Sequence, residues 1–214
     1  RVPADVLVHV VMSDEGRPLS YYSFMSDISD RKYAERLKET LNEIDLLVHS
    51  TLDFDVIMHR ALRAAAIALG ASSGSVVTYE DDAVAVVRYS YPNDWVDVGT
   101  RFSPEQAPFT LDLIKDKLPL VVGDTASDSR FHLASTERFG TKGFLAIPLL
   151  VRGAVPAGLS LSFSEVQEFE VADVDFIRKL GSSISLALEN AHLFEEREQA
   201  FRELAEKDIA IRQA

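Results

Sequence analysis

Residues 119–132 read PLVVGDTASDSRFH, and residues 143–149 read GFLAIPL. The first stretch opens as a short apolar strand, which ends at Asp124 and continues as a polar, irregular loop. The second stretch is a longer apolar strand, and after a short turn residues 157–163 alternate large apolar side chains with small ones. This alternation is typical of a β-strand. We therefore expect a strand, a loop and a β-hairpin in this order.

On both sides of this segment, apolar residues follow the helical period. Residues 54–69 form a strongly amphipathic pattern, for which Asp53 can serve as the N-cap and Gly70 as the stop. Residues 30–49 predict an earlier helix, and one long helix begins near residue 169. Predicted long helices therefore precede and follow the central strand segment in the sequence.

Between these helices, residues 75–79 and 83–91 predict a β-hairpin, and residues 108–117 predict a short helix with a proline at its start. The order of elements is helix, hairpin, short helix, strand, loop, hairpin and long helix. Such an order is typical of an α+β fold, in which an antiparallel sheet carries its helices on one face. Long N- and C-terminal helices are expected to flank this sheet.

The N-terminal region has a different character. Residues 5–12 and 19–26 predict a second β-hairpin, which needs a partner because two strands alone are marginal in water. The hairpin runs directly into the helix through Asp27, Ser29 and Asp30, which are all good N-cap types. Asp27 and Arg31 are also spaced for a helical ion pair.

Composition excludes several classes of function. The chain has 214 residues, a formal net charge of −12 and no cysteine. An acidic surface repels phosphates, so we expect no nucleic acid and no direct membrane contact as partners. The lack of cysteine excludes disulfides, thiolate zinc sites and thioether-linked chromophores, and it fits a cytoplasmic location. No apolar run approaches the roughly 20 residues of a membrane span.

Two blocks resemble known sensor families. The run DISDRK at residues 27–32 resembles the C-terminal end of a PAS (PAC) domain, whose last strand leads into a signalling helix. Asp124, Asp128, Arg130 and Phe131, with Pro148, Leu149 and Gly158, resemble the GAF sensor-domain pattern over roughly residues 45–192. The resemblance implies four parts: a PAS hairpin remnant at 1–30, a signalling helix at 31–50, a GAF domain at 51–192 and a coiled-coil-like signalling helix at 193–214.

The GAF resemblance also implies a ligand pocket between the sheet and the elements above it. Aromatic side chains in a small domain more often fill the core than hold a ligand. Ser160 and Ser162 either point into the same cavity or face solvent. The candidate pocket residues are Tyr89, Trp95, Phe102, Phe109, Leu113, Phe131, His132, Phe139, Phe144, Ile147, Ser160 and Ser162.

Cofactor and catalytic signals are weak. Bilin-binding relatives use a cysteine, and this chain has none, so we expect no covalent bilin. Haem would need a histidine, for which His132 is the one nominee, and a lone histidine is usually an ordinary side chain. Asp124, Asp128 and Arg130 either bind a metal or an anion or brace their loop, and we expect bracing and no metal. We find no nucleophile elbow and no phosphate loop, so we expect no enzyme in this stretch.

Three hypotheses on function remain. The preferred one is a sensory and dimerisation module of a signalling protein, which binds an unknown small ligand. The flanking helices then relay the signal to an output domain of the same chain, such as a histidine kinase. The second is a ligand-free scaffold that couples helices, and the third is a haem-based redox or gas sensor. The expected seam of a parallel homodimer comprises Leu37, Leu41, Ile44, Ile177, Leu180, Ile184, Leu188, Ala191 and Phe194.

Overall fold

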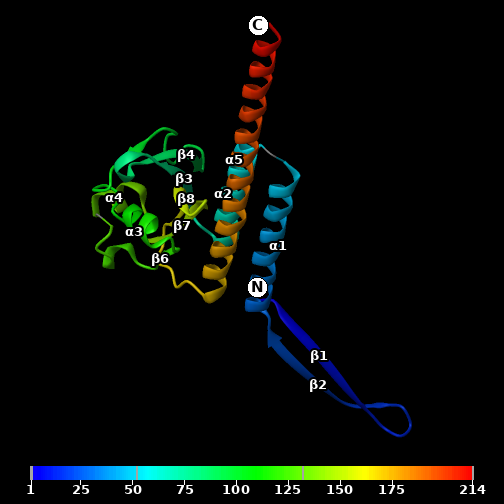
Figure 1. The fold of residues 1–214 in the computed structure, drawn as a ribbon. Helices are drawn as coiled ribbons and strands as arrows, with labels where there is room; N and C mark the ends of the chain where they lie inside the picture. Colours follow the sequence, from blue (N-terminus) through cyan, green and yellow to red (C-terminus); the bar gives the residue numbers. More distant parts are fainter. Residues whose placement is uncertain (1, 52, 132, 214) are drawn as a thin grey trace.

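The computed structural model describes residues 2–51, 53–131 and 133–213 and contains two separate β-sheets (Figure 1). The smaller sheet is an antiparallel hairpin of β1 (Ala4–Met12) and β2 (Pro18–Asp27), as the alternation predicts. It extends away from the remaining elements, and its large apolar side chains are exposed on both faces.

Helix α1 (Ser29–Ser50) follows β2 directly. The Asp27 carboxylate accepts a hydrogen bond from the backbone N–H of Ser29 at 2.8 Å. The helical spacing predicts an ion pair between Arg31 and Asp27, but the structure does not show it. Arg31 donates instead to Asp5 on β1 at 2.8 Å. The reason is that the hairpin folds Asp5 back beside the first turn of the helix, and Asp27 already binds the backbone.

The larger sheet has six antiparallel strands in the order β5-β4-β3-β8-β7-β6. The two expected hairpins form its centre and the expected short strand forms one edge, whereas β5 at the other edge has no clear signal in the sequence. The turn between β7 and β8 places Arg152 and Gly153 at φ of 49° and 78°, the left-handed conformations that a two-residue hairpin turn requires. The strands are β3 (Ser73–Tyr79), β4 (Ala85–Tyr91), β5 (Arg101–Phe102), β6 (Leu120–Val122), β7 (Gly143–Val151) and β8 (Ala154–Phe163).

The long helices lie on one side of this sheet in two layers (Figure 1). Helices α2 (Phe54–Leu69) and α5 (Val171–Gln213) lie against the sheet, and α1 packs on them from the outer side. Asp53 caps α2 by accepting the N–H of Val56 at 3.2 Å, and Gly70 ends it at φ 71°, so both predicted helix signals are confirmed. The short helices α3 (Phe109–Asp116) and α4 (Leu133–Phe139) lie over the opposite face.

The main hydrophobic core lies between the sheet and the long helices. Strands β7 and β8 send every second side chain into it, because successive residues of a strand point to opposite faces. Met58 and Leu62 of α2 and Ile184 of α5 are at most 1% exposed. The strand residues that meet them are Leu145, Ile147, Leu149, Leu159, Leu161 and Phe163.

This core accounts for most of the residues that the sequence suggested as a seam between chains. Because α1, α2 and the sheet belong to the same chain, they cover the apolar stripe of α5 without a second copy. Within the expected seam, Ala191 is half-buried and Phe194 is 45% exposed. The members that lie in or against the intramolecular core are Leu37, Leu41, Ile44, Ile177, Leu180, Ile184 and Leu188.

None of the helices in the described ranges is both long enough and apolar enough to cross a membrane.

Candidate functional site

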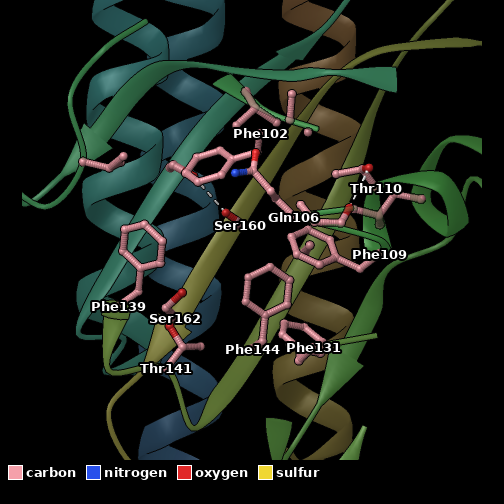
Figure 2. Close-up of a pocket in the computed structure, with 18 of the residues that line it drawn as sticks. Phe102, Gln106, Phe109, Thr110, Phe131, Phe139, Thr141, Phe144, Ser160 and Ser162 are labelled. Carbon is pink, nitrogen blue, oxygen red and sulfur yellow. Dashed lines mark hydrogen bonds between the residues drawn. The ribbon is translucent and has the colours of Figure 1, made fainter. Parts of the chain in front are cut away.

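A cavity of about 110 Å³ lies between the larger sheet and the segments that carry α3 and α4 (Figure 2). Its floor is formed by β3, β7 and β8, and its walls are mostly apolar. It lies on the face of the sheet opposite to the main core, where a smaller cluster around Leu113 and Phe144 is buried. The fold therefore has one face filled by helices and one face with space left in it.

The period of β8 decides which residues form the floor. Leu159, Leu161 and Phe163 face the long helices, so the small residues between them face the cavity. Gly158 has no room for a side chain, because a Cβ there would lie 2.4 Å from the Tyr79 hydroxyl oxygen. Ser160 and Ser162 line the cavity, which decides between the two orientations that the sequence left open.

Two groups of aromatic rings form the walls. At one end Phe139 contacts Trp95 and Phe102, with ring centroids 5.5 Å and 6.0 Å apart. At the other end Phe109 stacks on Phe131 at 5.3 Å, and Phe144 lies 4.7 Å from Phe109 and 5.0 Å from Phe131. Figure 2 shows the Phe139 ring and this second group on opposite sides, with Ser160 and Ser162 between them.

Hydroxyl groups run along the floor between the rings. Ser75 on β3 and Ser160 on β8 share a hydrogen bond of 3.0 Å between their hydroxyl oxygens. Thr110 donates to the carbonyl of Ala107 at 2.8 Å. At the edge beside Gly158, burial raises the pKa of Tyr79 above its ordinary value, so its hydroxyl is protonated at neutral pH.

Among the described residues, Arg130 is the one charged side chain that lines the cavity. Its guanidinium contacts Asp128 at 2.5 Å and Asp112 at 3.4 Å, so its charge is already balanced. The pKa of Asp128 is lowered, mainly because Arg130 donates hydrogen bonds to its carboxylate. Asp124 accepts the N–H of Ala126 at 2.9 Å. These contacts support the bracing role that we expected for the loop.

Most of the aromatic residues selected from the sequence lie at this cavity. Nine of the candidates line it: Trp95, Phe102, Phe109, Leu113, Phe131, Phe139, Phe144, Ser160 and Ser162. Two others face the long helices instead. His132 lies outside the described residues, so the structure gives no account of it.

Ile147 and Tyr89 are the two corrections, and strand geometry explains both. Ile147 lies one residue beyond Ala146, which lines the cavity, so it points to the other face. Tyr89 pairs with Val76, whose side chain belongs to the helix-side core, and paired residues share a face. The Tyr89 hydroxyl there donates to Asp55 of α2.

Several polar residues that line the cavity were not among the candidates chosen from the sequence. They are Ser75, Tyr79, Gln106, Thr110 and Thr141. Ser75 is the direct partner of Ser160 in the β3–β8 ladder, so its position follows once strand pairing is known. Tyr79 ends β3 and Thr110 lies in the first turn of α3, whereas Gln106 and Thr141 come from loops, where no periodic pattern exists to find them. In the described part of the chain, no cluster of His, Asp or Glu side chains is arranged to hold a metal ion.

Comparisons with known proteins agree with this architecture. A family model described as the GAF domain matches residues 51–189. No curated protein matches the sequence of the chain. Among solved structures, the GAF domain of a phosphoenolpyruvate-protein phosphotransferase from Coxiella burnetii shares 17% identity at a TM-score of 0.65, with 76% of this chain and 98% of that chain covered.

Two further similar structures contain small molecules. The free methionine-R-sulfoxide reductase from Neisseria meningitidis, solved in complex with its substrate, shares 15% identity at a TM-score of 0.64, covering 75% of this chain and 92% of that chain. The phycocyanobilin-bound GAF domain from a cyanobacterial phytochrome shares 17% identity at a TM-score of 0.63, covering 73% of this chain and 96% of that chain. At these identities the likeness shows the fold.

Proposed function

The chain belongs to the GAF domain family, and we propose that it is a cytoplasmic sensory module that binds a small molecule in the cavity and passes the event through its long helices to an output domain of the same protein. The observation that carries this proposal is the unfilled cavity on one face of a sheet whose other face is packed against helices. Similar folds hold a substrate and a bilin in the structures named above.

Strand β7 offers a direct mechanical connection between the cavity and α5. Phe144 and Ala146 line the cavity, whereas Ile147 packs against α5 at Gly181, where a Cβ would lie 3.1 Å from the Ile147 Cδ1 atom. The Ser185 hydroxyl of α5 also accepts the backbone N–H of Leu150 at 2.8 Å. A ligand that moves β7 therefore moves the surface on which α5 lies.

Two side-chain hydrogen bonds connect α5 to α1. Tyr33 donates to Asp173 at 2.5 Å near the start of α5, and Ser183 donates to Asp45 at 2.5 Å three turns further along. Such paired contacts fix the register of two helices, so a shift of α5 reaches α1 as well. Both helices thus serve as signalling helices in this proposal, as the regions at 31–50 and 193–214 suggest.

We place the contact between two copies on the part of α5 that its own chain leaves exposed. Leu193, Phe194 and Phe201 are 48%, 45% and 60% exposed, and Figure 1 shows α5 extending beyond the sheet. A second copy in parallel orientation would bury both stripes and keep both helix ends on the same side, where one output domain per chain can read them. The proposed seam therefore keeps Phe194 of the original candidates and moves toward the C-terminus.

The β1–β2 hairpin fits the remnant of a PAS sheet. Phe24 and Tyr22 on one face and Met25 and Tyr21 on the other are all more than half exposed. A strand that is apolar on both faces is typical of the interior of a layered domain. We therefore propose that residues 1–30 complete a PAS domain and that α1 connects it to the GAF domain.

The experiment that tests the sensory function is native mass spectrometry combined with hydrogen exchange. We expect a dimer that retains a small molecule, and slower exchange in β7 and α5 than in the same protein after the molecule is removed by dialysis. A bare dimer with unchanged α5 exchange in the presence of a cell metabolite extract would contradict the proposal. That result would favour a ligand-free scaffold, for which the fully packed helix face is the supporting observation.

A further inference from the structure

Two hydroxyl groups at one end of the cavity, on the buried residues Ser162 and Thr141, have no hydrogen-bond partner in the part of the chain that the structure describes. Ser162 is 2% exposed and Thr141 is 8% exposed. Among the described residues, neither side-chain oxygen has a hydrogen-bond partner, and because no side-chain polar atom of these residues is both fully buried and unpaired, the two oxygens open into the cavity that both residues line. Figure 2 shows the two side chains close together, between Phe139 and Phe144. A hydroxyl that opens into a cavity is free to bond water or a ligand, and a ligand that displaces the water without replacing its hydrogen bond leaves the group unsatisfied at a cost of about 1–3 kcal/mol.

The chemistry of the walls limits which molecule can bind beside the two hydroxyls. The rings of Phe139 and Phe144 on either side offer no conventional hydrogen bond, so a water molecule between them would find hydrogen-bond partners only at the hydroxyl groups. A molecule with an apolar ring and a polar end would satisfy both surfaces. Aromatic rings also prefer offset or edge contacts with other rings, which the opposed wall groups can provide.

The charge of the lining limits the choice of ligand further. The guanidinium of Arg130 is held by Asp128 and Asp112, and the remaining described lining groups are apolar or uncharged hydroxyls and amides. An anion placed here would lose its hydration without gaining a free counter-charge, which costs several kcal/mol. The cavity therefore selects against carboxylates and phosphates.

Size sets the last limit. A dry apolar cavity of about 150 Å³ accepts benzene, and this cavity measures about 110 Å³. The cavity is thus somewhat smaller than one that holds benzene, so a single ring is the largest aromatic group that it accepts, and a short substituent requires the α3 and α4 segments to move outward.

We propose that the cavity binds an uncharged, single-ring aromatic compound whose hydrogen-bonding substituent, such as a carboxamide or a hydroxyl, lies against Ser162 and Thr141. This inference rests on the proposed sensory function and names the class of ligand for the same site. Gln106 reaches over the cavity from the loop before α3, and its side-chain oxygen accepts the N–H of Ser103 at 3.0 Å, so its amide N–H groups are oriented by that contact.

The test compares neutral and charged compounds of the same shape by calorimetry on the full 214-residue chain. We expect benzamide to bind at least about 100-fold more tightly than benzoate, because only benzoate buries a charge. Cyclohexanecarboxamide should bind more weakly than benzamide, because it lacks the aromatic faces. Equal or tighter binding of benzoate, or no binding of benzamide at millimolar concentration, would overturn the inference.

Variants of the two hydroxyls give an independent readout. Ser162→Ala and Thr141→Val should each weaken benzamide binding about threefold to tenfold, the range of one lost hydrogen bond. Neither should lower the melting temperature of the free protein, since each removes a hydroxyl that bonds no other described residue. Ser164→Ala, at an exposed serine two residues beyond Ser162, is the matched control and should change neither quantity. A loss of stability with unchanged binding would show that the hydroxyls are structural.

The two proposals fail in different ways. If native mass spectrometry finds a charged or much larger molecule in the cavity, the sensory function stands and the ligand class is wrong. If benzamide binds as described but exchange in α5 does not change, the ligand class stands and the relay is wrong.

Discussion

The two faces of the six-stranded sheet differ in how completely the chain fills them. On the helix side, Met58, Leu62, Ile177, Leu180 and Ile184 are at most 1% exposed. On the other side, short helices and loops enclose a cavity into which the hydroxyls of Ser162 and Thr141 open without a partner among the described residues. A protein that needed only stability would fill both faces alike, so the difference separates the part that holds the fold from the part that is available for a ligand.

The largest expected effect comes from a charge in the packed face. Ile184→Glu should destabilise the protein by about 4 kcal/mol or more, because Ile184 is fully buried in the apolar core, where a carboxylate loses its hydration. Urea unfolding followed by circular dichroism measures this loss.

Leu186→Glu is the matched control, on the same helix and 48% exposed. It should change the free energy of unfolding by no more than about 0.5 kcal/mol. If Ile184→Glu remained folded and only lost its dimeric state, Ile184 would lie in a seam between chains after all, and the packed face would not be intramolecular.

A smaller effect is expected at the edge where the cavity meets β3. Gly158→Ala should cost about 1–3 kcal/mol, because its Cβ would lie 2.4 Å from the Tyr79 hydroxyl oxygen. Tyr79→Phe removes that oxygen and leaves the ring carbon at 3.2 Å, so the double variant should recover part of the loss. A double-mutant cycle by urea unfolding gives the coupling. Strictly additive effects would show that the clash is relieved elsewhere.

The smallest effect compares one tyrosine from each face. Tyr33 donates to Asp173, so Tyr33→Phe should cost about 1 kcal/mol at pH 7. Tyr79 has no hydrogen-bond partner among the described residues, so Tyr79→Phe should leave the stability at pH 7 unchanged. Thermal or urea unfolding at pH 7 separates the two variants, and equal losses would mean that Tyr79 has a partner in solution.

The same pair predicts a dependence on alkaline pH. Burial raises the pKa of both tyrosines above the ordinary value of about 10, and the contact with Asp173 raises that of Tyr33 further. Because the folded state holds these protons more strongly than the unfolded state, their contribution is complete below about pH 10 and is lost as pH rises through the folded-state pKa values. Each Phe variant should therefore flatten the loss of stability above pH 10.

The sequence predicted most of the fold because its signals were local. The Asp53 cap, the Gly70 stop and the alternation in β8 each place an element within a residue or two of its observed bounds. β5 was missed because two residues are too few for a period to show. Most residues of the predicted seam pack within the chain instead, because an apolar stripe on α5 shows that burial is required without showing which surface provides it.

For the site, the sequence identified residue types more reliably than their directions. Nine aromatic, aliphatic and serine candidates reach the cavity, whereas Tyr89 and Ile147 point to the other face. Each error is a matter of strand register, since one step along a strand reverses the face. Thr141 and Gln106 come from loops, whose positions depend on contacts far away in the chain.

The sequence alone determined most of the elements, their order, the family pattern around residues 119–149 and the absence of any cysteine chemistry. These follow from local backbone preferences and side-chain types, which are present in the chain before it folds. Only the tertiary structure decided that the α5 stripe is covered by its own chain, that Ser162 and Thr141 face a cavity without partners, and that Arg130 is already neutralised. Those facts depend on which distant segments meet, and period and composition do not encode that directly.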